Sequence, residues 1–317
     1  MAAHRLAANM PDAEPPPPIS VVICTRDRPD SLAATLRSVA AQDYPSFDVL
    51  VVDQSTGGET AALVAGTPAI RYLHLDTPGL SRAYNAGVRG TGAGLLAFAD
   101  DDVVAPPDWL SRIAAAFAAH PASGLLYGQV LVPPELLERE NSDGVTPALP
   151  IARRRVLDRR NGFRVFGMGA NFAARRELFE RVGGFDEVLG GGGPLQSSQD
   201  FDFMYRVFRG GESTLLEPDV VVYHYGFRSS ADWPATVRSY GIGVGGFCLK
   251  HLRLGDLYAA RVLLGFVGGA SLRLLKRLLT FRTPAEQWTF LRNVVTGMRR
   301  SLRFPIDRRL RLYRVQP

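Results

Sequence analysis

An apolar segment that stops on three consecutive aspartates constrains this chain more than any other feature. Residues 95–99 (LLAFA) form an uninterrupted apolar run, which is typical of a strand buried on both faces of a sheet. Because side chains alternate along an extended chain, Asp100 and Asp102 are predicted to project to one side and Asp101 to the other. Two carboxylates on one side favour a hard divalent cation, which commonly arrives with a phosphate substrate. A solvated acidic turn is the alternative for the triplet alone.

The surrounding segments predict an α/β domain with a parallel sheet covered on both faces. Apolar, β-branched runs predict strands at 19–24, 47–53 and 70–75. Helical spacing predicts helices at 31–42, 59–65 and 81–90, with Asp30 or Ser31 as the first N-cap and Asp108 capping a helix after Pro106 and Pro107. Parallel strands end at one edge of a sheet, where α/β proteins bind ligands, so this edge is the candidate metal-phosphate site.

Composition places the chain among globular proteins, with 46% hydrophobic and 21% charged residues in a length of 317. The two cysteines, Cys24 and Cys248, lack metal-ligand spacing and favour a reducing cytoplasm. The first residues lack an apolar signal segment, and the four prolines at 15–18 predict a disordered lead-in over 1–18. No uninterrupted apolar run is long enough to predict a membrane-spanning helix.

Six segments, in this order, resemble the inverting glycosyltransferases of family 2 of bacterial type. The resemblance covers about residues 19–225 and implies a GT-A fold, a Rossmann-like and mostly parallel sheet with helices on both faces, over 19–230. A helical C-terminal extension would follow over 231–317. The segments are VVICTRDRPDSLAATLRSVAAQ, VLVVDQST, GLSRAYNAG, FADDD (with the Asp-x-Asp motif), GMGANFAARRELFERVGGFDE and QDFDFMYRVFRGG.

The resemblance also implies roles for residues at the strand ends. Thr25 and Asp53 would contact the nucleotide base, and Arg82 the base or the pyrophosphate. Asp100 would hold the ribose or the donor sugar, and arginines at this edge can hold phosphates. The full set expected to bind the sugar nucleotide is Thr25, Arg26, Asp53, Arg82, Asp100 and Asp101.

The metal in this family would bridge the two phosphates of the donor and bind Asp102. His224 ends a strand predicted over 219–226, and some GT-A enzymes ligate metal with a histidine at the matching place. A carboxylate with an imidazole suits Mn²⁺, and Mg²⁺ is the other expected ion. A structural role for His224 is the equal alternative.

Asp200 matches the catalytic base of the family, although Gln199 stands where an acid usually precedes it. Read from the residues alone, Asp200 lies in the first turn of a helix capped by Ser197 or Ser198, where a carboxylate also complements the helix dipole. Asp202 and Arg206 are spaced as a structural ion pair. The expected donor-sugar and acceptor pocket comprises Gly169, Ala170, Asn171 and Gln199.

Two further segments have open interpretations. The arginine-rich stretch 139–162 is either a solvated loop or an acceptor-recognition loop that attracts an anionic substrate. The glycine-rich stretch 190–194 is either a lid over the acceptor or a plain loop.

The C-terminal region is strongly cationic. Residues 251–317 contain 14 Lys and Arg against 3 Asp and Glu, whereas residues 1–250 contain 23 against 28. Segment 257–281 is apolar with interspersed cations and resembles an interfacial helix. It predicts either attachment to an anionic membrane surface, on the inner face of the cytoplasmic membrane, or helices packed back on the domain with a solvated basic face. Nucleic acid is excluded because no recognised nucleic-acid module is present and aromatics for stacking are few.

The resulting hypothesis is a metal-dependent, inverting glycosyltransferase of the hexosyltransferase type. It would use a nucleotide-diphosphate sugar and a glycan or lipid-linked acceptor, in the synthesis of cell-surface glycans or glycolipids. A sugar-1-phosphate nucleotidyltransferase is disfavoured, because its first loop is glycine-rich and TRDRPD (25–30) contains no glycine. A non-catalytic membrane-surface adaptor on a GT-A-like fold is the other alternative, and the intact carboxylates argue against it.

Overall fold

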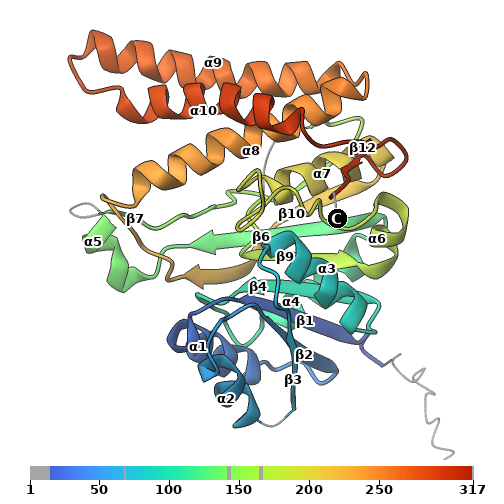
Figure 1. The fold of residues 1–317 in the computed structure, drawn as a ribbon. Coiled ribbons are helices and arrows are strands. Elements are labelled where there is room, and N and C mark those ends of the chain that lie inside the picture. Colours follow the sequence, from blue (N-terminus) through green and yellow to red (C-terminus); the bar gives the residue numbers. More distant parts are fainter. Residues whose placement is uncertain (1–14, 68, 141–143, 164–166, 316–317) are drawn as a thin grey trace, which may run out of the picture.

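The computed structural model describes residues 15–67, 69–140, 144–163 and 167–315 (Figure 1). Most of the predicted lead-in therefore lies outside the described residues, and residues 15–18 are exposed. The strands are β1 (Ile19–Thr25), β2 (Phe47–Asp53), β3 (Ile70–His74), β4 (Leu95–Asp100), β5 (Val103–Val104), β6 (Ser123–Leu131), β7 (Gly144–Val145), β8 (Arg155–Leu157), β9 (Asn171–Arg175), β10 (Ser213–His224), β11 (Arg228–Ser229), β12 (Ile306–Asp307) and β13 (Leu312–Tyr313).

Ten α-helices and one 3₁₀ turn lie in the described part of the chain. They are α1 (Pro29–Ala40), α2 (Glu59–Ala65), α3 (Leu80–Gly90), α4 (Trp109–Ala119), a 3₁₀ turn (Pro134–Leu136), α5 (Leu137–Glu140), α6 (Arg176–Val182), α7 (Gln199–Gly210), α8 (Trp233–Arg253), α9 (Tyr258–Leu279) and α10 (Ala285–Ser301).

The main sheet has the order β3-β2-β1-β4-β9-β6-β10-β5, and β8 pairs with β10. Strands β1 to β4 are parallel to one another, and β6 is parallel to β10. Strand β9 is inserted antiparallel between β4 and β6. The α/β class and the mostly parallel sheet are confirmed.

Each face of the sheet is covered by its own helices and core, as the buried strands predict. In β1, Val21 and Ile23 belong to a cluster with residues of α1, α2 and α4, while Val22 and Cys24 belong to a cluster with residues of α3, α6 and α7. Alternate side chains of β1 therefore fill the cores on opposite faces of the sheet.

A third layer, formed by α8, α9 and α10, lies over the α7 side of the body (Figure 1). Its core joins Val244 and Phe247 of α8 to Leu195 and Tyr205. Helix α8 shares this core with residues that precede position 230. The domain boundary expected at residue 230 therefore stays a prediction. No helix in the described part of the chain has both the length and the apolar character needed to cross a membrane.

Several element boundaries differ from the predictions. Helix α1 begins at Pro29, with Arg28 at the N-cap instead of Asp30 or Ser31, because the fixed φ of proline suits the first helical position. Asp108 is the N-cap of α4, but its side chain accepts a hydrogen bond from Arg112 (2.7 Å) instead of capping the backbone.

The 139–162 segment and the strand of His224 also contain more structure than expected. Strand β7 pairs with β11, and β8 pairs with β10 along its extra N-terminal length. Strand β10 begins at Ser213, and its pairing with β6 shifts register between Glu217 and Val221. Arg154 forms an ion pair with the buried Glu217, so part of this arginine-rich segment is tied to the sheet.

Candidate functional site

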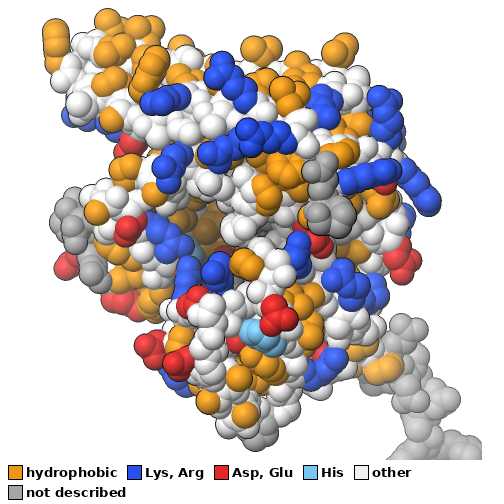
Figure 2. All heavy atoms as spheres, viewed as in Figure 1, with side chains coloured by type: hydrophobic (Ala, Val, Ile, Leu, Met, Phe, Trp, Pro, Cys, Tyr) orange, Lys and Arg blue, Asp and Glu red, His pale blue; other side chains and the backbone are white. Residues whose placement is uncertain are grey.

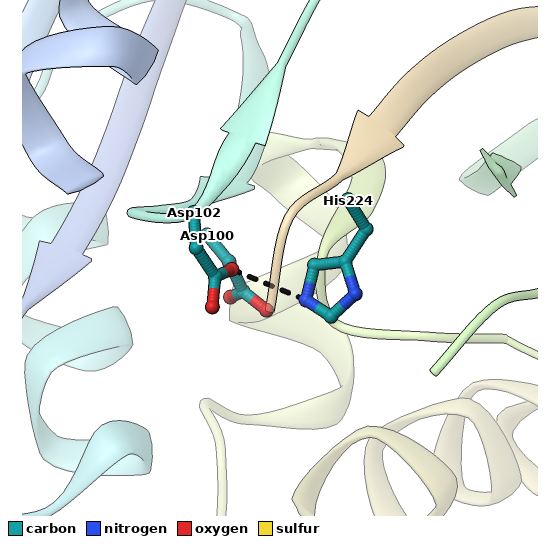
Figure 3. A group of neighbouring side chains, drawn as sticks. All are labelled: Asp100, Asp102 and His224. Atoms are coloured by element: carbon teal, nitrogen blue, oxygen red, sulfur yellow. Dashed lines mark ion pairs between the residues drawn. The ribbon is translucent and has the colours of Figure 1, made fainter. Parts of the chain in front are cut away.

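Three side chains predicted to act together converge at the carboxyl edge of the sheet. Asp100 is the last residue of β4, Asp102 follows in the next turn, and His224 ends β10, the strand against which β5 folds back. One ligand atom from each residue lies within 4.8 Å of the others (Figure 3). Asp100 and Asp102 therefore lie together as predicted, although the strand ends at Asp100 and a turn at 101–102, rather than strand alternation, places the second carboxylate.

The hydrogen bonds of this group suit a divalent cation. Nδ1 of His224 lies 2.9 Å from the carbonyl oxygen of Pro147, so an Nδ1–H donates there and Nε2 can offer its lone pair towards the carboxylates. Nε2 lies 3.1 Å from Oδ1 of Asp102, but this buried oxygen has no hydrogen-bond partner of good geometry. An orphaned carboxylate oxygen beside an imidazole nitrogen fits a metal site.

Gly226 leaves room beside these ligand atoms. A Cβ atom at this position would lie 2.6 Å from both Oδ2 of Asp102 and Nε2 of His224. Any larger residue would therefore fill the space in which an ion would be held.

The two carboxylates have pKa values shifted in opposite directions. Burial raises the pKa of Asp100 to about 7, and the nearby charge of Asp102 adds to this effect. For Asp102, burial acts in the same direction but is outweighed by His224 and Arg28, so its pKa is lowered to about 2. Burial also acts against protonation of His224, yet its contact with Asp102 raises the pKa of the imidazole. A negative charge is thus concentrated on Asp102 before any cation binds.

Asp101 is not part of this group and organises the adjacent loop. Its Oδ2 accepts a hydrogen bond from Thr25 (2.7 Å), and its Oδ1 accepts one from Arg28 (2.7 Å). The same Arg28 nitrogen donates to Oδ2 of Asp102 (2.8 Å). Arg28 was not among the predicted site residues; its position in the loop after β1, near Thr25 and Arg26, was the available signal.

Two cavities meet at this edge. The narrow cavity, of about 420 Å³, is lined by Thr25, Arg26, Arg28, Gln54, Gly192 and the three aspartates, among others. The wide cavity, of about 1200 Å³, lies beneath α8, where the surface is hollowed (Figure 2). Both cavities are lined by Leu80, Asp100, Gly191, His224 and Arg228. The carboxylate–imidazole group therefore stands at their junction.

Loop residues from two predicted segments form walls of these cavities. Gly191 belongs to the 190–194 stretch, and Gly192 there has φ 76° and so requires glycine-like freedom. Residues 145–149, from the arginine-rich segment, line the wide cavity.

Asp200 lines the wide cavity from the first turn of α7. Burial raises its pKa to about 6, and backbone N–H groups, including that of Phe201 at 2.9 Å, oppose this rise. Ser198 is the N-cap residue by position, with φ 67°, but its side chain does not cap the helix. Gln199 and Gly169 line the same cavity.

Asp202 and Arg206 form the predicted structural pair, at 2.9 Å, and both side chains are buried. Asp202 also contacts Lys250 and His251 of α8. It therefore belongs to the core rather than to the cavity.

Four predicted site residues lie outside the cavity walls. Ala170 and Asn171 are fully buried, and the Asn171 amide binds Trp109 and two carbonyl oxygens of neighbouring strands. Asp53 is buried and accepts hydrogen bonds from Tyr72 and Ser55, whereas the adjacent Gln54 lines the narrow cavity. Arg82 pairs with Glu187 at 3.3 Å. Residues next to a cavity-lining residue in the sequence can themselves be buried away from the cavity. The sequence pattern does not show which of the neighbours reaches the cavity wall.

The wide cavity also contains residues that sequence reasoning missed. Trp233 and Tyr240 of α8 stand at 6.4 Å between ring centroids, and both line the cavity with Arg228. No motif marks them; only the placement of α8 above the sheet brings them to the site.

Comparison with known proteins identifies the class of this fold and site. The family model described as glycosyl transferase family 2 matches residues 20–183. The chain therefore belongs to glycosyl transferase family 2.

Individual relatives are more distant. The chain is 36% identical over 103 residues to the succinoglycan biosynthesis protein ExoM of Rhizobium meliloti, covering 30% of this chain and 33% of that protein. It is 24% identical over 261 residues to the pre-mycofactocin glycosyltransferase of Mycobacterium tuberculosis, covering 78% of this chain and 52% of that protein. The chain thus spans a third to about half the length of these curated relatives.

A solved structure supports the GT-A fold. The mannosyltransferase PcManGT from Pyrobaculum calidifontis, in complex with GDP-Man and Mn²⁺, superimposes with a TM-score of 0.59 at 20% identity. The match covers 90% of this chain and 87% of that one. At this identity the likeness establishes the fold.

Proposed function

We propose that this protein transfers a sugar from a nucleotide-diphosphate sugar to an acceptor hydroxyl, with inversion at the anomeric carbon. The observation that carries the proposal is the junction of two cavities at Asp100, Asp102 and His224, with Asp200 on the wall of the wider one. The narrow cavity has the volume of a site for a small ligand, and the wide one can hold a second substrate beside it.

In this assignment the narrow cavity holds the donor. Arg26 and Arg28 supply positive charge for the diphosphate, and Gln54, whose amide is held by Thr77 and Gly79, forms part of the cavity wall. Arg28 is held in place by its two aspartate partners, so its guanidinium is oriented before the donor binds.

Asp102, His224 and Asp100 would hold a divalent cation, Mn²⁺ or Mg²⁺. The solved relative with Mn²⁺ and GDP-Man supports this choice. Bound there, the ion would supply Lewis-acid stabilisation of the charge that develops on the leaving diphosphate. The lowered pKa of Asp102, about 2, supports its role as the charged ligand, whereas the pKa of Asp100 is raised to about 7.

Asp200 would act as the general base on the acceptor hydroxyl. A base with a pKa of about 6 is deprotonated at neutral pH yet remains more basic than an ordinary aspartate. Attack from the wide cavity, on the face opposite the diphosphate, would invert the anomeric centre.

Asp200→Asn tests this role. The amide cannot accept the proton, so sugar transfer should fall by at least ~10²-fold, while donor and metal binding stay close to normal. The wild-type rate should also rise with pH through about 6, because only the deprotonated carboxylate can act as the base. Radiolabelled sugar transfer gives the rate, and thermal shift with the donor gives binding.

A wild-type transfer rate in Asp200→Asn would rule out Asp200 as the base. Asp202→Asn is a poor substitute test, because that residue is part of a buried ion-pair network.

Asp102→Asn and Asp101→Asn form a matched pair that tests the metal assignment. Asp102→Asn should abolish the Mn²⁺-dependent rise in melting temperature caused by the donor. Asp101→Asn should do much less, because this side chain binds Thr25 and Arg28 rather than facing the cation site. A thermal-shift panel of UDP-, GDP- and dTDP-sugars, with and without Mn²⁺, measures both and also identifies the nucleotide. Equal losses at the two positions would contradict the proposed metal site.

The acceptor is proposed to belong to a cell-surface glycan or glycolipid. A relative named for succinoglycan biosynthesis supports this class. A cytoplasmic location suits the use of sugar nucleotides, and the two buried cysteines are free thiols.

A further inference from the structure

Helix α9 exposes a row of leucines to solvent. Leu257 directly precedes the helix, and its spacing to the other members by seven, eight, three and four residues keeps the row on one helical face. The side chains are between 51% and 81% exposed. We call this row the leucine face; it consists of Leu257, Leu264, Leu272, Leu275 and Leu279.

The surroundings of the leucine face are cationic. From Tyr258 to Ser301, helices α9 and α10 with their connection contain eight Lys and Arg and a single acid, Glu286. Among the residues that the structure describes, none of these eight cations is in an ion pair. Figure 2 shows apolar side chains along the upper edge of the molecule, with Lys and Arg in a band beneath them. The cations are Arg261, Arg273, Lys276, Arg277, Arg282, Arg292, Arg299 and Arg300.

The other side of α9 forms part of the proposed active site. Phe266, Ala270 and Arg273 line the wide cavity, together with Phe290 of α10. These positions are about half a helical turn away from the leucine face. One helix, about 10 Å across, therefore separates the exposed leucines from the cavity that contains Asp200.

We propose that the leucine face binds an anionic membrane surface, and that the wide cavity thereby receives a lipid-linked acceptor from that membrane. The second part rests on the proposed function. A helix lying in the headgroup region buries its apolar face by about 5–10 Å, which would bring the cavity close to the membrane surface. Cations around the leucines would contact anionic headgroups, and the long side chain of Arg261 can extend out of the apolar layer.

Charge favours a membrane over a second copy of this chain as the occupant. A symmetric dimer through the leucine face would bring two cationic surfaces together, because the same patch must meet itself. An anionic bilayer offers an apolar layer in which the exposed leucines can be buried. Its headgroups carry the charge opposite to that of the surrounding cations.

The first test measures binding of the full chain to vesicles by sedimentation. The vesicles are phosphatidylcholine alone, or phosphatidylcholine with roughly a quarter phosphatidylglycerol. We expect sedimentation with the anionic vesicles at low salt and release as salt shortens the Debye length from ~10 Å at 0.1 M to ~3 Å at 1 M.

The double variant Leu264→Gln/Leu272→Gln should lower the vesicle partition coefficient about tenfold or more, because two isobutyl groups no longer enter the lipid. Leu137→Gln in α5, where the leucine is 50% exposed, is the matched control and should bind like the wild type. Failure of the wild type to bind anionic vesicles at low salt, or undiminished binding by the double variant, would overturn the proposal. A concentration-dependent dimer that the double variant abolishes, without vesicle binding, would identify a second copy as the occupant.

A second test addresses the acceptor. With labelled donor and native membranes, label should enter the lipid fraction extracted by organic solvent, and the double variant should incorporate less. Both proteins should show the same donor-induced thermal shift, since the leucine face is remote from the narrow cavity; loss of that shift in the wild type would refute the proposed function instead. Label found only in water-soluble glycan would overturn the lipid-linked acceptor while leaving sugar transfer intact.

Discussion

Helices α8 and α9 are of similar length and composition but are packed very differently. Helix α8 has 21 residues and α9 has 22, and both combine apolar residues, several glycines and scattered cations. Eleven residues of α8 are buried, against two of α9. Whether an apolar helix with scattered cations is buried or exposed therefore depends on the elements that pack against it.

Glycines account for part of the difference. In α8 they allow the backbone of α10 to approach: a Cβ at Gly245 would lie 2.0 Å from the carbonyl oxygen of Val294, and one at Gly241 would lie 2.6 Å from that of Phe290. At Gly265 and Gly268 of α9, no atom lies within 4 Å of the corresponding position. Small residues permit close packing only where a second helix is present.

The partners of the cations account for the remaining difference in burial between α8 and α9. Lys250 of α8 is fully buried, and its Nζ lies 2.6 Å from both Asp186 and Asp202. Asp186 also accepts the backbone N–H of Tyr313 (2.8 Å), so the chain end is tied to the same network. The cations of α9 have no such acids opposite them in the described chain.

The largest expected effect comes from breaking this network. Lys250→Met should lower the free energy of unfolding by about 3–5 kcal/mol, because the buried Asp186 loses its cation and Asp202 keeps only Arg206. Lys276→Met, on exposed α9, should change it by no more than about 0.5 kcal/mol. Urea denaturation of both variants measures the contrast, and equal changes would mean that the two helices are not differently packed.

Glycine-to-alanine substitutions should change the free energy of unfolding in opposite directions in α8 and α9. Gly245→Ala should destabilise the protein by about 1–3 kcal/mol, since its Cβ meets backbone atoms of α10 that cannot rotate away. Gly265→Ala should instead stabilise it by about 0.5–1 kcal/mol through helix propensity alone. The same denaturation series measures both, and a destabilising Gly265→Ala would show that α9 packs more closely than described.

The smallest effect, taken per pH unit, is the pH dependence of the free energy of unfolding. Burial lowers the pKa of His251 to about 4, although Asp202 accepts a hydrogen bond from its ring. Below the unfolded value of 6.5, the unfolded chain therefore binds more protons at this residue. The contribution of His251 to stability should be fully present above pH 6.5 and decline as pH falls towards 4, by up to about 1 kcal/mol per pH unit.

Comparison of the wild type with His251→Gln isolates this slope in urea denaturation at several pH values. Asp100 and Asp200, whose pKa values are raised, act in the opposite direction and cancel in the comparison. An unchanged slope in His251→Gln would contradict the buried, neutral histidine.

Local patterns predicted part of the ligand group at the sheet edge. The sequence predicted that Asp100 and Asp102 act together without Asp101, and the structure groups these two carboxylates with His224, although a turn after β4 rather than strand alternation brings them together. His224 was proposed from the family resemblance, since a lone histidine at a strand end has an equal structural interpretation. Ala170 and Asn171 show the limit of such patterns, because a matching motif does not reveal which of its residues reaches a cavity wall.

Local patterns in the sequence predicted the α/β class, the order of elements from β1 to α4 and the cluster of carboxylates, because period-two and helical spacings are local properties; strands β6 and β9 and helix α6 were not predicted. The tertiary structure alone decided that Lys250 is buried while Lys276 is solvated, and that Trp233 and Tyr240 line the wide cavity. These outcomes depend on residues far apart in the chain, such as Asp186 opposite Lys250. The free energy of burying a charge is set by the partner that packing brings, which the spacing of residues along the chain does not encode.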